Sequence, residues 1–317
     1  MDTAKKIDSK ATLVTAIYHH SHKEIIGGRG WCFDFYSPPF LNILKLDLPI
    51  IIYTHEKVFG KLSKFMQKHR HDDDYKIIIQ DLNDFKYGSR ILDIKRKSGW
   101  FLNDRLKSDI PYTYNDRNHT LCLSKLYWLN QAVNDNYYNS NSFFWIDAGL
   151  FHHGIFPEKF GGREKFSKQE TKPELYYPEN KASIFTPNMG KFLSDYKEKI
   201  LTIVKEEMPI RPRIKELIAP SANRHIDYII GGLFGGDPKT INSVHRDFDE
   251  GLQICLDNNL VTLEEELLSC IALKNPDLYN KFYFYQWWHD IKEDPAYYDI
   301  GEDEKCFYKL FKNEFQA

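Results

Sequence analysis

The sequence predicts an α/β fold: a single Rossmann-like domain with a mixed, mostly parallel central sheet flanked by helices. Two observations carry this prediction. Continuous apolar runs, such as 12–18 and 49–54, are rich in β-branched residues, which is typical of strands buried on both faces. Segments with helical periodicity separate such runs, and this alternation is the pattern of a parallel sheet covered on both sides. A chain of 317 residues is long enough for one enlarged domain with a sizeable core.

The first half of the chain alternates in this way from its start. Four apolar runs are expected to be strands: 12–18, 49–54, 77–79 and 143–146. Helices are expected at 36–46 and at 121–133, where apolar residues recur at helical spacing. The stretch 85–118 is polar and irregular, which favours a loop or small helices.

The second half is expected to add further helices and strands. We expect strands at 182–186 and 226–230, and helices at 190–206, 240–257 and 262–273. Thr262 and Glu265 have the spacing of a capping box at the start of the last helix. The residues from Tyr279 onward are expected to form a helical and aromatic C-terminal extension. We assign 1–150 to a donor-binding half and 151–317 to an acceptor-binding half of the same domain, including that tail.

Composition excludes several classes of function. The formal net charge is −2, so no global positive field gathers a long polyanion, and nucleic acid is not expected as a partner. The short basic run 95–97 is interpreted as a solvated face. The five cysteines are scattered without a Cys-x-x-Cys pair, which indicates a reducing compartment. No signal-peptide core or bilayer-spanning stretch is visible, so we expect a cytoplasmic protein, with peripheral contact at the inner face of the cell membrane left open.

The strongest candidate site is the run Trp145-Ile146-Asp147-Ala148-Gly149 at the end of a predicted strand. In an open α/β sheet, ligands bind beyond the carboxyl ends of the strands. A carboxylate at such an end, followed by small residues, suits a ribose hydroxyl or a divalent cation. The structural alternative is an Asp that caps the next turn.

Three weaker candidates follow. The run Gly231-Gly232-Leu233-Phe234-Gly235-Gly236 is interpreted as a glycine loop whose backbone approaches a ligand closely, although it is neither a P-loop nor Gly-x-Gly-x-x-Gly. Glu264 and Glu265 could act as a general base, or could simply favour the helix dipole. Several histidines could meet phosphate or metal, but none has a recognised ligand spacing: His19, His20, His22, His152, His153 and His289.

Together these pieces resemble the HtrL/YibB-like bacterial proteins, a glycosyltransferase-like family often associated with surface-polysaccharide gene clusters. The resemblance spans most of the chain, and its specific part is the order of Trp-Ile-Asp-Ala-Gly at 145–149 and Gly-Gly-Leu-Phe-Gly-Gly at 231–236. The strand 13–16, the run 49–54 and the pair Ser124-Lys125 add to it. The family looks like the GT-A superfamily of sugar-nucleotide-dependent glycosyltransferases.

The resemblance implies residue roles. Asp147 takes the first position of the Asp-x-Asp element, and Lys125 approaches a phosphate. The catalytic set is Asp147, Glu264 and Glu265. The donor site comprises Thr15, Ala16, Tyr18, Lys125, Trp145, Ile146, Asp147, Ala148 and Gly149. The acceptor side comprises Gly231, Gly232, Leu233, Phe234 and Gly235.

One departure concerns the metal. Gly149 stands where the second carboxylate of the Asp-x-Asp element is expected, so the element reads Asp-Ala-Gly. Either a histidine such as His152, His153 or His289 completes a Mn²⁺ or Mg²⁺ shell with Asp147, or a cationic group replaces the metal.

The expected function is therefore transfer of a sugar from a nucleoside diphosphate sugar to an oligosaccharide or lipid-linked saccharide, in bacterial surface-polysaccharide (lipopolysaccharide or capsule) synthesis. One alternative is a sugar-phosphate nucleotidyltransferase, for which Gly27-Gly28-Arg29-Gly30 partly imitates the required loop. The other is a non-catalytic carbohydrate-binding protein on the same scaffold.

Overall fold

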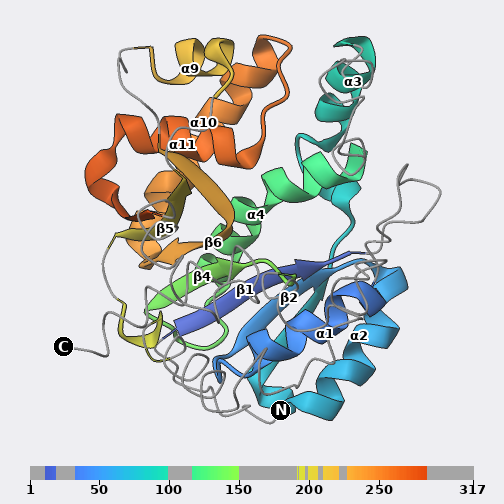
Figure 1. The fold of residues 1–317 in the computed structure, drawn as a ribbon. Helices are drawn as coiled ribbons and strands as arrows, with labels where there is room; N and C mark the ends of the chain where they lie inside the picture. The colour runs from blue at the N-terminus through green and yellow to red at the C-terminus, as the bar shows by residue number, and fades with distance from the viewer. Residues whose placement is uncertain are drawn as a thin grey trace, which may run out of the picture.

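The computed structural model describes residues 11–18, 33–98, 116–149, 191, 193–196, 199–205, 210–220 and 227–283. In this part of the chain a seven-stranded sheet runs through the molecule (Figure 1), in the order β3-β2-β1-β4-β6-β5-β7. Only β6 runs against the other strands, because it pairs antiparallel with both β4 and β5. The strands are β1 (Ala11–Ile17), β2 (Ile50–Thr54), β3 (Tyr75–Ile79), β4 (Ser142–Ile146), β5 (Ile200–Lys205), β6 (Tyr228–Gly236) and β7 (Tyr279–Tyr283).

Helices cover both faces of this sheet (Figure 1). The described helices are α1 (Phe33–Leu44), α2 (Glu56–His69), α3 (Gly88–Ser98), α4 (Asp116–Asp135), α9 (Pro212–Ile218), α10 (Pro238–Asp257) and α11 (Glu264–Lys274). Helix α10 begins where its sequence predicts a start, since Asp237 accepts a hydrogen bond from the Thr240 N–H (3.0 Å) and Pro238 stands at the first helical position. Within the described residues, no helix has the length and apolar character needed to cross a membrane.

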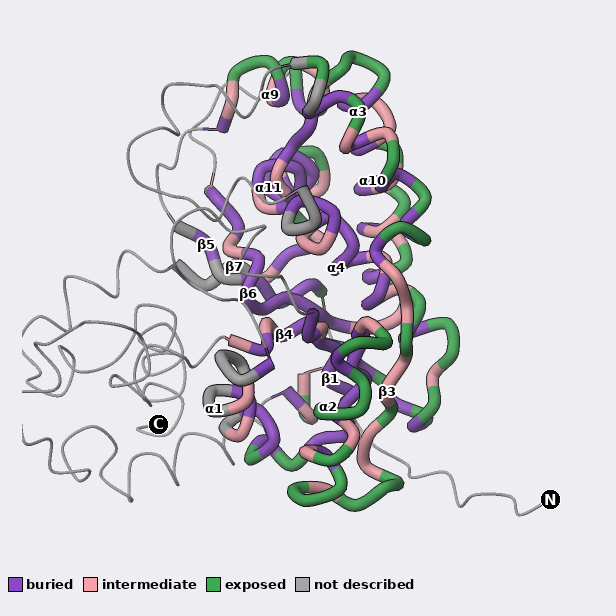
Figure 2. Tube along the Cα trace, turned by 90° about the vertical axis from the view of Figure 1, so that its right-hand side faces the viewer, coloured by how far each residue is buried: buried purple, intermediate pink, exposed green. Residues whose placement is uncertain are grey.

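Two hydrophobic cores lie on opposite faces of the sheet. One contains residues of α1 and α2, and the other contains residues of α3, α4, α10 and α11. Strand β4 feeds both, because successive side chains point to opposite faces. Phe143 and Trp145 enter the α4 side, whereas Phe144 and Ile146 enter the α1 side. All four are fully buried, and the tube in Figure 2 is buried along most of the central strands.

The fold class is confirmed, and the first four predicted strands occur within two residues of their expected starts. Helix α4 is longer than the predicted 121–133, and α3 gives the irregular stretch a helix of 11 residues. The predicted strand 182–186 and the loop 27–30 lie outside the described residues.

Several predictions for the second half are wrong. The predicted helix 190–206 is helical at 191 and 193–195, but its end is β5, which pairs with β6 on one side and β7 on the other, so sheet pairing overrides the helical pattern there. The aromatic extension begins with an edge strand, β7. The glycine run 231–236 is the second half of β6, not a loop. Lys95 is fully buried, not solvated as predicted for its basic run, and its Nζ lies 3.2 Å from His119 Nδ1.

The predicted capping box of the last helix is also wrong by one position. Helix α11 begins at Glu264, so its N-cap is Leu263. The carboxylate that reaches back is Glu266, whose Oε2 accepts from the Leu263 N–H at 3.2 Å. Glu265 is therefore free for other contacts.

Candidate functional site

The site lies where the order of the sheet reverses. β1 has β2 on one side and β4 on the other, and all three strands run parallel. A crevice forms at such a point outside the carboxyl ends of the two strands, and ligands of open α/β sheets bind there. Tyr18 directly follows β1, and Asp147 directly follows β4. The topology therefore brings two of the predicted donor residues to the same edge.

Asp147 is held in place from three directions. Its backbone N–H donates to the carbonyl of Gly232 at 2.9 Å, which extends the β4–β6 ladder by one bond. The Trp145 indole Nε1–H donates to Oδ1 at 2.7 Å, because residues two apart in a strand share a face. The third direction is Lys125 of α4, whose Nζ lies 3.0 Å from Oδ1 and 3.2 Å from Oδ2. The Asp147 side chain keeps 37% of its surface exposed, so a ligand can still reach it.

Lys125 is the centre of the cluster. Its side chain is only 6% exposed, and its ammonium meets Asp147, the Gly231 carbonyl at 3.1 Å and Glu264 Oε1 at 3.0 Å. An ammonium has three N–H bonds, and these three acceptors use all of them. Lys125 therefore supports the two carboxylates, and a direct hydrogen bond to a donor phosphate would require one of these contacts to break.

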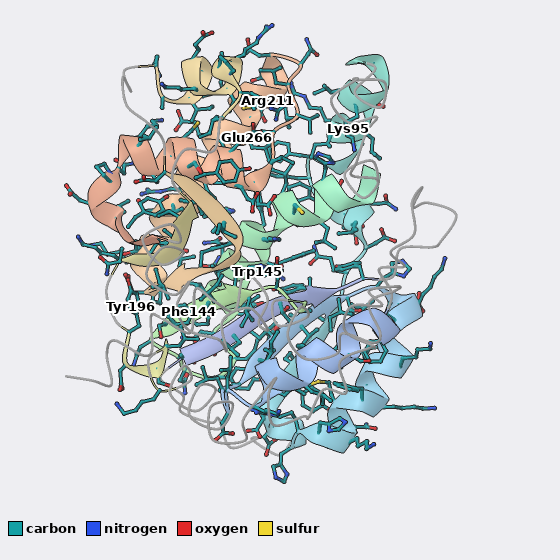
Figure 3. All side chains as sticks on the ribbon, in the orientation of Figure 1. Lys95, Phe144, Trp145, Tyr196, Arg211 and Glu266 are labelled. Carbon is teal, nitrogen blue, oxygen red and sulfur yellow. The ribbon has the colours of Figure 1, made fainter. Side chains whose placement is uncertain are left out.

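Three consecutive glutamates at the start of α11 have three separate partners. Glu264 pairs with Lys125. Glu265 accepts from the Gly231 N–H at 3.0 Å and from the Tyr228 hydroxyl at 3.1 Å. Glu266 receives a bidentate ion pair from Arg211, which joins the start of α9 to α11 (Figure 3). The sequence left open whether Glu264 and Glu265 only favour the helix dipole. In the structure, Glu265 holds α11 against β6 and Glu266 holds it against the start of α9.

Gly231 is required by this arrangement. A Cβ on Gly231 would lie 2.6 Å from Glu264 Oε1 and 3.3 Å from Glu265 Cγ. Its carbonyl accepts from Lys125 and its N–H donates to Glu265, so the strand backbone is held between these two side chains. Glycine in a strand interior is typical of such a close approach.

The electrostatics of the cluster follow from its burial. Burial alone would lower the pKa of the Lys125 ammonium, but Asp147 and Glu264 outweigh it and hold that pKa well above its usual value. Burial raises the pKa of the Asp147 carboxyl, and Lys125 and the Trp145 indole oppose that rise. Burial, together with the neighbouring Glu264, raises the pKa of Glu265 to about 7. A pKa of about 7 allows the Glu265 carboxyl to exchange a proton near neutral pH.

A row of aromatic rings supports the site from the α4 side of the sheet. Trp128 of α4 stacks on Tyr18 with ring centroids 5.5 Å apart and on Trp145 at 6.0 Å. Trp145 stacks in turn on Phe234 of β6 at 6.5 Å. Trp145, labelled in Figure 3, is thus clamped between α4 and β6, which fixes the indole that orients Asp147.

The other predicted donor residues contribute mainly to the fold. Thr15, Ile146 and Ala148 are buried, Ala16 is partly buried, and Tyr18 is buried with its hydroxyl donating to the Gln80 carbonyl at 2.9 Å. The predicted acceptor residues Leu233 and Phe234 fill the two cores from β6. A ligand contact by any of these side chains stays a prediction. His152, His153 and His289 lie outside the described residues.

The described residues do not fit a divalent cation at Asp147. Among them, no group of three His, Cys, Asp or Glu side chains is arranged to hold a metal ion. Both oxygens of Asp147 lie against the Lys125 ammonium, and Oδ1 also accepts from Trp145. A positive charge already occupies the inner side of the carboxylate.

A separate hollow of about 640 Å³ lies beside α10 and α4. Its lining includes Asn130 of α4 and Lys239, Asn242 and Arg246 of α10. None of the predicted site residues lines it.

Comparisons with known proteins agree with the family resemblance. Residues 9–197 match the model of a family described as "Bacterial protein of unknown function (HtrL_YibB)". No curated protein matches the chain.

Solved structures with similar folds are distant. Mouse xyloside xylosyltransferase 1 in its apo form is 10% identical with a TM-score of 0.39, covering 93% of this chain and 92% of its own. The 4-diphosphocytidyl-2C-methyl-D-erythritol synthase of Anaerococcus prevotii is 9% identical with a TM-score of 0.37, covering 98% and 97%. HddC from Yersinia pseudotuberculosis is 10% identical with a TM-score of 0.32, covering 86% and 89%. At these values the likenesses carry no functional argument.

Proposed function

We propose that this chain, which belongs to the HtrL_YibB family, is a GT-A-type glycosyltransferase that moves a sugar from a nucleoside diphosphate sugar to a saccharide acceptor. The observation that carries the proposal is Asp147 at the switch point of the sheet. Its carboxylate is fixed by Lys125 and Trp145, and 37% of its side chain faces outward. A preorganised carboxylate beyond parallel strands is suited to position a hydroxylated ligand such as a sugar nucleotide.

In the proposed reaction, the bond from the anomeric carbon to the diphosphate breaks and a bond to the acceptor oxygen forms. The diphosphate leaves with the bonding electrons, and the acceptor hydroxyl loses its proton. We assign that proton to Glu265, because its raised pKa of about 7 makes it a base near neutral pH. Glu264 is paired with Lys125 and serves as a positioning residue. We also propose that this reaction belongs to bacterial surface-polysaccharide synthesis.

The donor is identified by thermal-shift measurements with UDP-, GDP- and dTDP-sugars, and CMP-sugars, which carry a single phosphate, serve as the comparison. A ligand that binds only the folded state raises the melting temperature by mass action, by an amount that grows with concentration over Kd. We expect one nucleotide class to raise it. If no sugar nucleotide does so at millimolar concentration, the proposed function is wrong.

Asp147→Asn tests the central residue. Loss of a charge-assisted hydrogen bond costs roughly 1.5–3 kcal/mol, so we expect donor affinity to fall by roughly 10- to 100-fold. Asp73→Asn is the matched control, because Asp73 is exposed and precedes β3 at the opposite end of the strands. Titration calorimetry with the donor found in the screen measures both variants, and equal affinities would refute the role of Asp147.

Two alternative outcomes have their own signatures. Pyrophosphate release from a nucleoside triphosphate and a sugar phosphate would indicate a nucleotidyltransferase. Glycan binding without any nucleotide binding would indicate a carbohydrate-binding protein. Transfer of radiolabelled sugar from the matched donor to an oligosaccharide or lipid-linked acceptor would support the glycosyltransferase.

A further inference from the structure

In the cluster around Lys125, two carboxylates share one buried ammonium, so negative charges outnumber positive ones. Two carboxylates, Asp147 and Glu264, each lie 3.0 Å from one ammonium. They come from different elements, since Asp147 follows β4 and Glu264 begins α11. The Gly231 carbonyl of β6 is the third ligand of the ammonium at 3.1 Å. Three oxygens from three elements therefore surround one cation that the chain itself supplies.

This arrangement has the donor set that hard divalent ions prefer, namely carboxylate and carbonyl oxygens. The Lys125 ammonium already fills it. A Mn²⁺ or Mg²⁺ ion bound to Asp147 would lie within a few ångströms of that ammonium, and two like charges at such a distance in a partly buried place repel strongly. Lys125 could not easily withdraw, because its stem is buried and Glu264 and Gly231 hold it independently of Asp147.

The ammonium is also a permanent charge at working pH. Asp147 and Glu264 hold the pKa of Lys125 well above its usual value. Lys125 thus pairs with the Asp147 carboxylate, and the exposed part of the Asp147 side chain is left to meet a ligand. One ammonium is shared by two carboxylates, so Asp147 suits a neutral hydroxyl, which can donate to it, better than an anionic phosphate, which it would repel.

We infer that Lys125 takes the place of the divalent cation, and that Asp147 accepts a hydrogen bond from a hydroxyl of the sugar nucleotide without any metal. This inference rests on the proposed function for the identity of the ligand. The part that concerns the cation depends only on the described cluster. It also accounts for Gly149, because no second carboxylate is needed where no metal binds.

The first experiment measures Mn²⁺ binding directly, by electron paramagnetic resonance of free Mn²⁺ during titration of the full chain. We expect no Asp147-dependent Mn²⁺ site in the wild type. Lys125→Ser leaves two unpaired carboxylates and a carbonyl facing a vacated space, so we expect this variant to bind Mn²⁺ at least tenfold more tightly than the wild type. Adding Asp147→Asn to Lys125→Ser should abolish the gain.

Two further variants serve as controls. Lys86→Ser removes a lysine that pairs with a single carboxylate, Asp249, so it should gain no Mn²⁺ site. Lys125→Arg keeps the positive charge and should also gain none. Circular dichroism reports whether Lys125→Ser folds, and the wild-type and Lys125→Arg titrations decide the question if it does not.

The second experiment repeats the donor titration of the wild type in EDTA and in Mn²⁺. We expect the same affinity within twofold in both. The inference is overturned if EDTA abolishes donor binding and Mn²⁺ restores it, or if the wild type binds Mn²⁺ in a manner lost in Asp147→Asn. Absence of donor binding under every condition refutes the proposed function instead, and leaves the Mn²⁺ titration to decide about Lys125.

The donor has hydroxyls on both its ribose and its sugar, and Asp147→Asn distinguishes them. If the variant weakens the nucleoside diphosphate and the full donor equally, Asp147 binds the ribose. If it weakens only the full donor, Asp147 binds the transferred sugar. If it weakens neither, the hydroxyl contact is refuted.

Discussion

At the scale of single residues, Gly231 links the parts of the candidate site. Gly231→Ala places a Cβ 2.6 Å from Glu264 Oε1, so this oxygen, which pairs with Lys125, must shift. The atom that must move is the end of a side chain, and we expect a loss of about 1–3 kcal/mol in the free energy of unfolding. Urea denaturation measures this change. Donor affinity should fall as well, because Lys125 then loses one of the contacts that fix Asp147.

Gly60→Ala is the matched control for Gly231→Ala. Gly60 lies inside α2, and a Cβ there would meet nothing within 4 Å. Alanine is favoured over glycine in a helix interior by roughly 0.5–1 kcal/mol, so this variant should be more stable than the wild type. A loss of stability in both variants, or in neither, would contradict the assigned role of Gly231.

Sequence reasoning identified most of these residues without seeing how they meet. Asp147, Lys125, Glu264 and Glu265 were each candidates, because strand ends and glutamate runs have recognisable patterns. Their mutual contacts join segments 22 to 139 positions apart, from Lys125 with Asp147 to Lys125 with Glu264. No local pattern contains such a contact, so Lys125 was assigned to a phosphate when its ammonium is occupied by protein oxygens. The sequence places Trp145 in the donor site, but the spacing of the two residues does not by itself predict the hydrogen bond from its indole to Asp147.

At the scale of elements, the antiparallel pairing of β6 with β4 requires a glycine at position 235. A Cβ on Gly235 would lie 2.2 Å from the Phe143 carbonyl oxygen and 2.5 Å from Phe144 Cα. These are backbone atoms of a fully buried strand, so they cannot shift as a side-chain end can. Gly235→Ala should therefore cost more stability than Gly231→Ala, and we expect little folded protein. Circular dichroism and urea denaturation of the two alanine variants rank them, and the opposite order would refute this comparison.

The strands of the sheet differ in how well their own sequences predict them. β1, β2 and β4 are continuous apolar runs, whose period and length match buried parallel strands. β6 was predicted to end at residue 230 because paired glycines usually mark a turn. Here they allow two elements to approach closely, with α11 over Gly231 and β4 against Gly235. The local pattern at β5 predicts a helix, and the pairing that makes it a strand involves β6 and β7, which lie later in the chain.

At the scale of the whole molecule, Glu265 couples the candidate site to the stability of the fold. Its pKa rises from 4.5 to about 7 on folding, because of burial and the neighbouring Glu264. The folded state therefore binds this proton more tightly than the unfolded chain. The contribution to stability is fully present below the unfolded pKa, and it is lost as the pH rises through about 7.

Glu265→Gln isolates this contribution, because glutamine is neutral in both states and can still accept from the Gly231 N–H. Between pH 5 and pH 8 the free energy of unfolding of the variant should fall less than that of the wild type, by at most about 3 kcal/mol, since one pKa unit corresponds to about 1.4 kcal/mol. Urea denaturation at several pH values measures both proteins. Glu250→Gln, at an exposed position of α10, should keep the wild-type pH dependence. If Glu265→Gln keeps it too, Glu265 does not hold a proton in the folded protein near neutral pH, and the assignment of this residue as the base loses its physical basis.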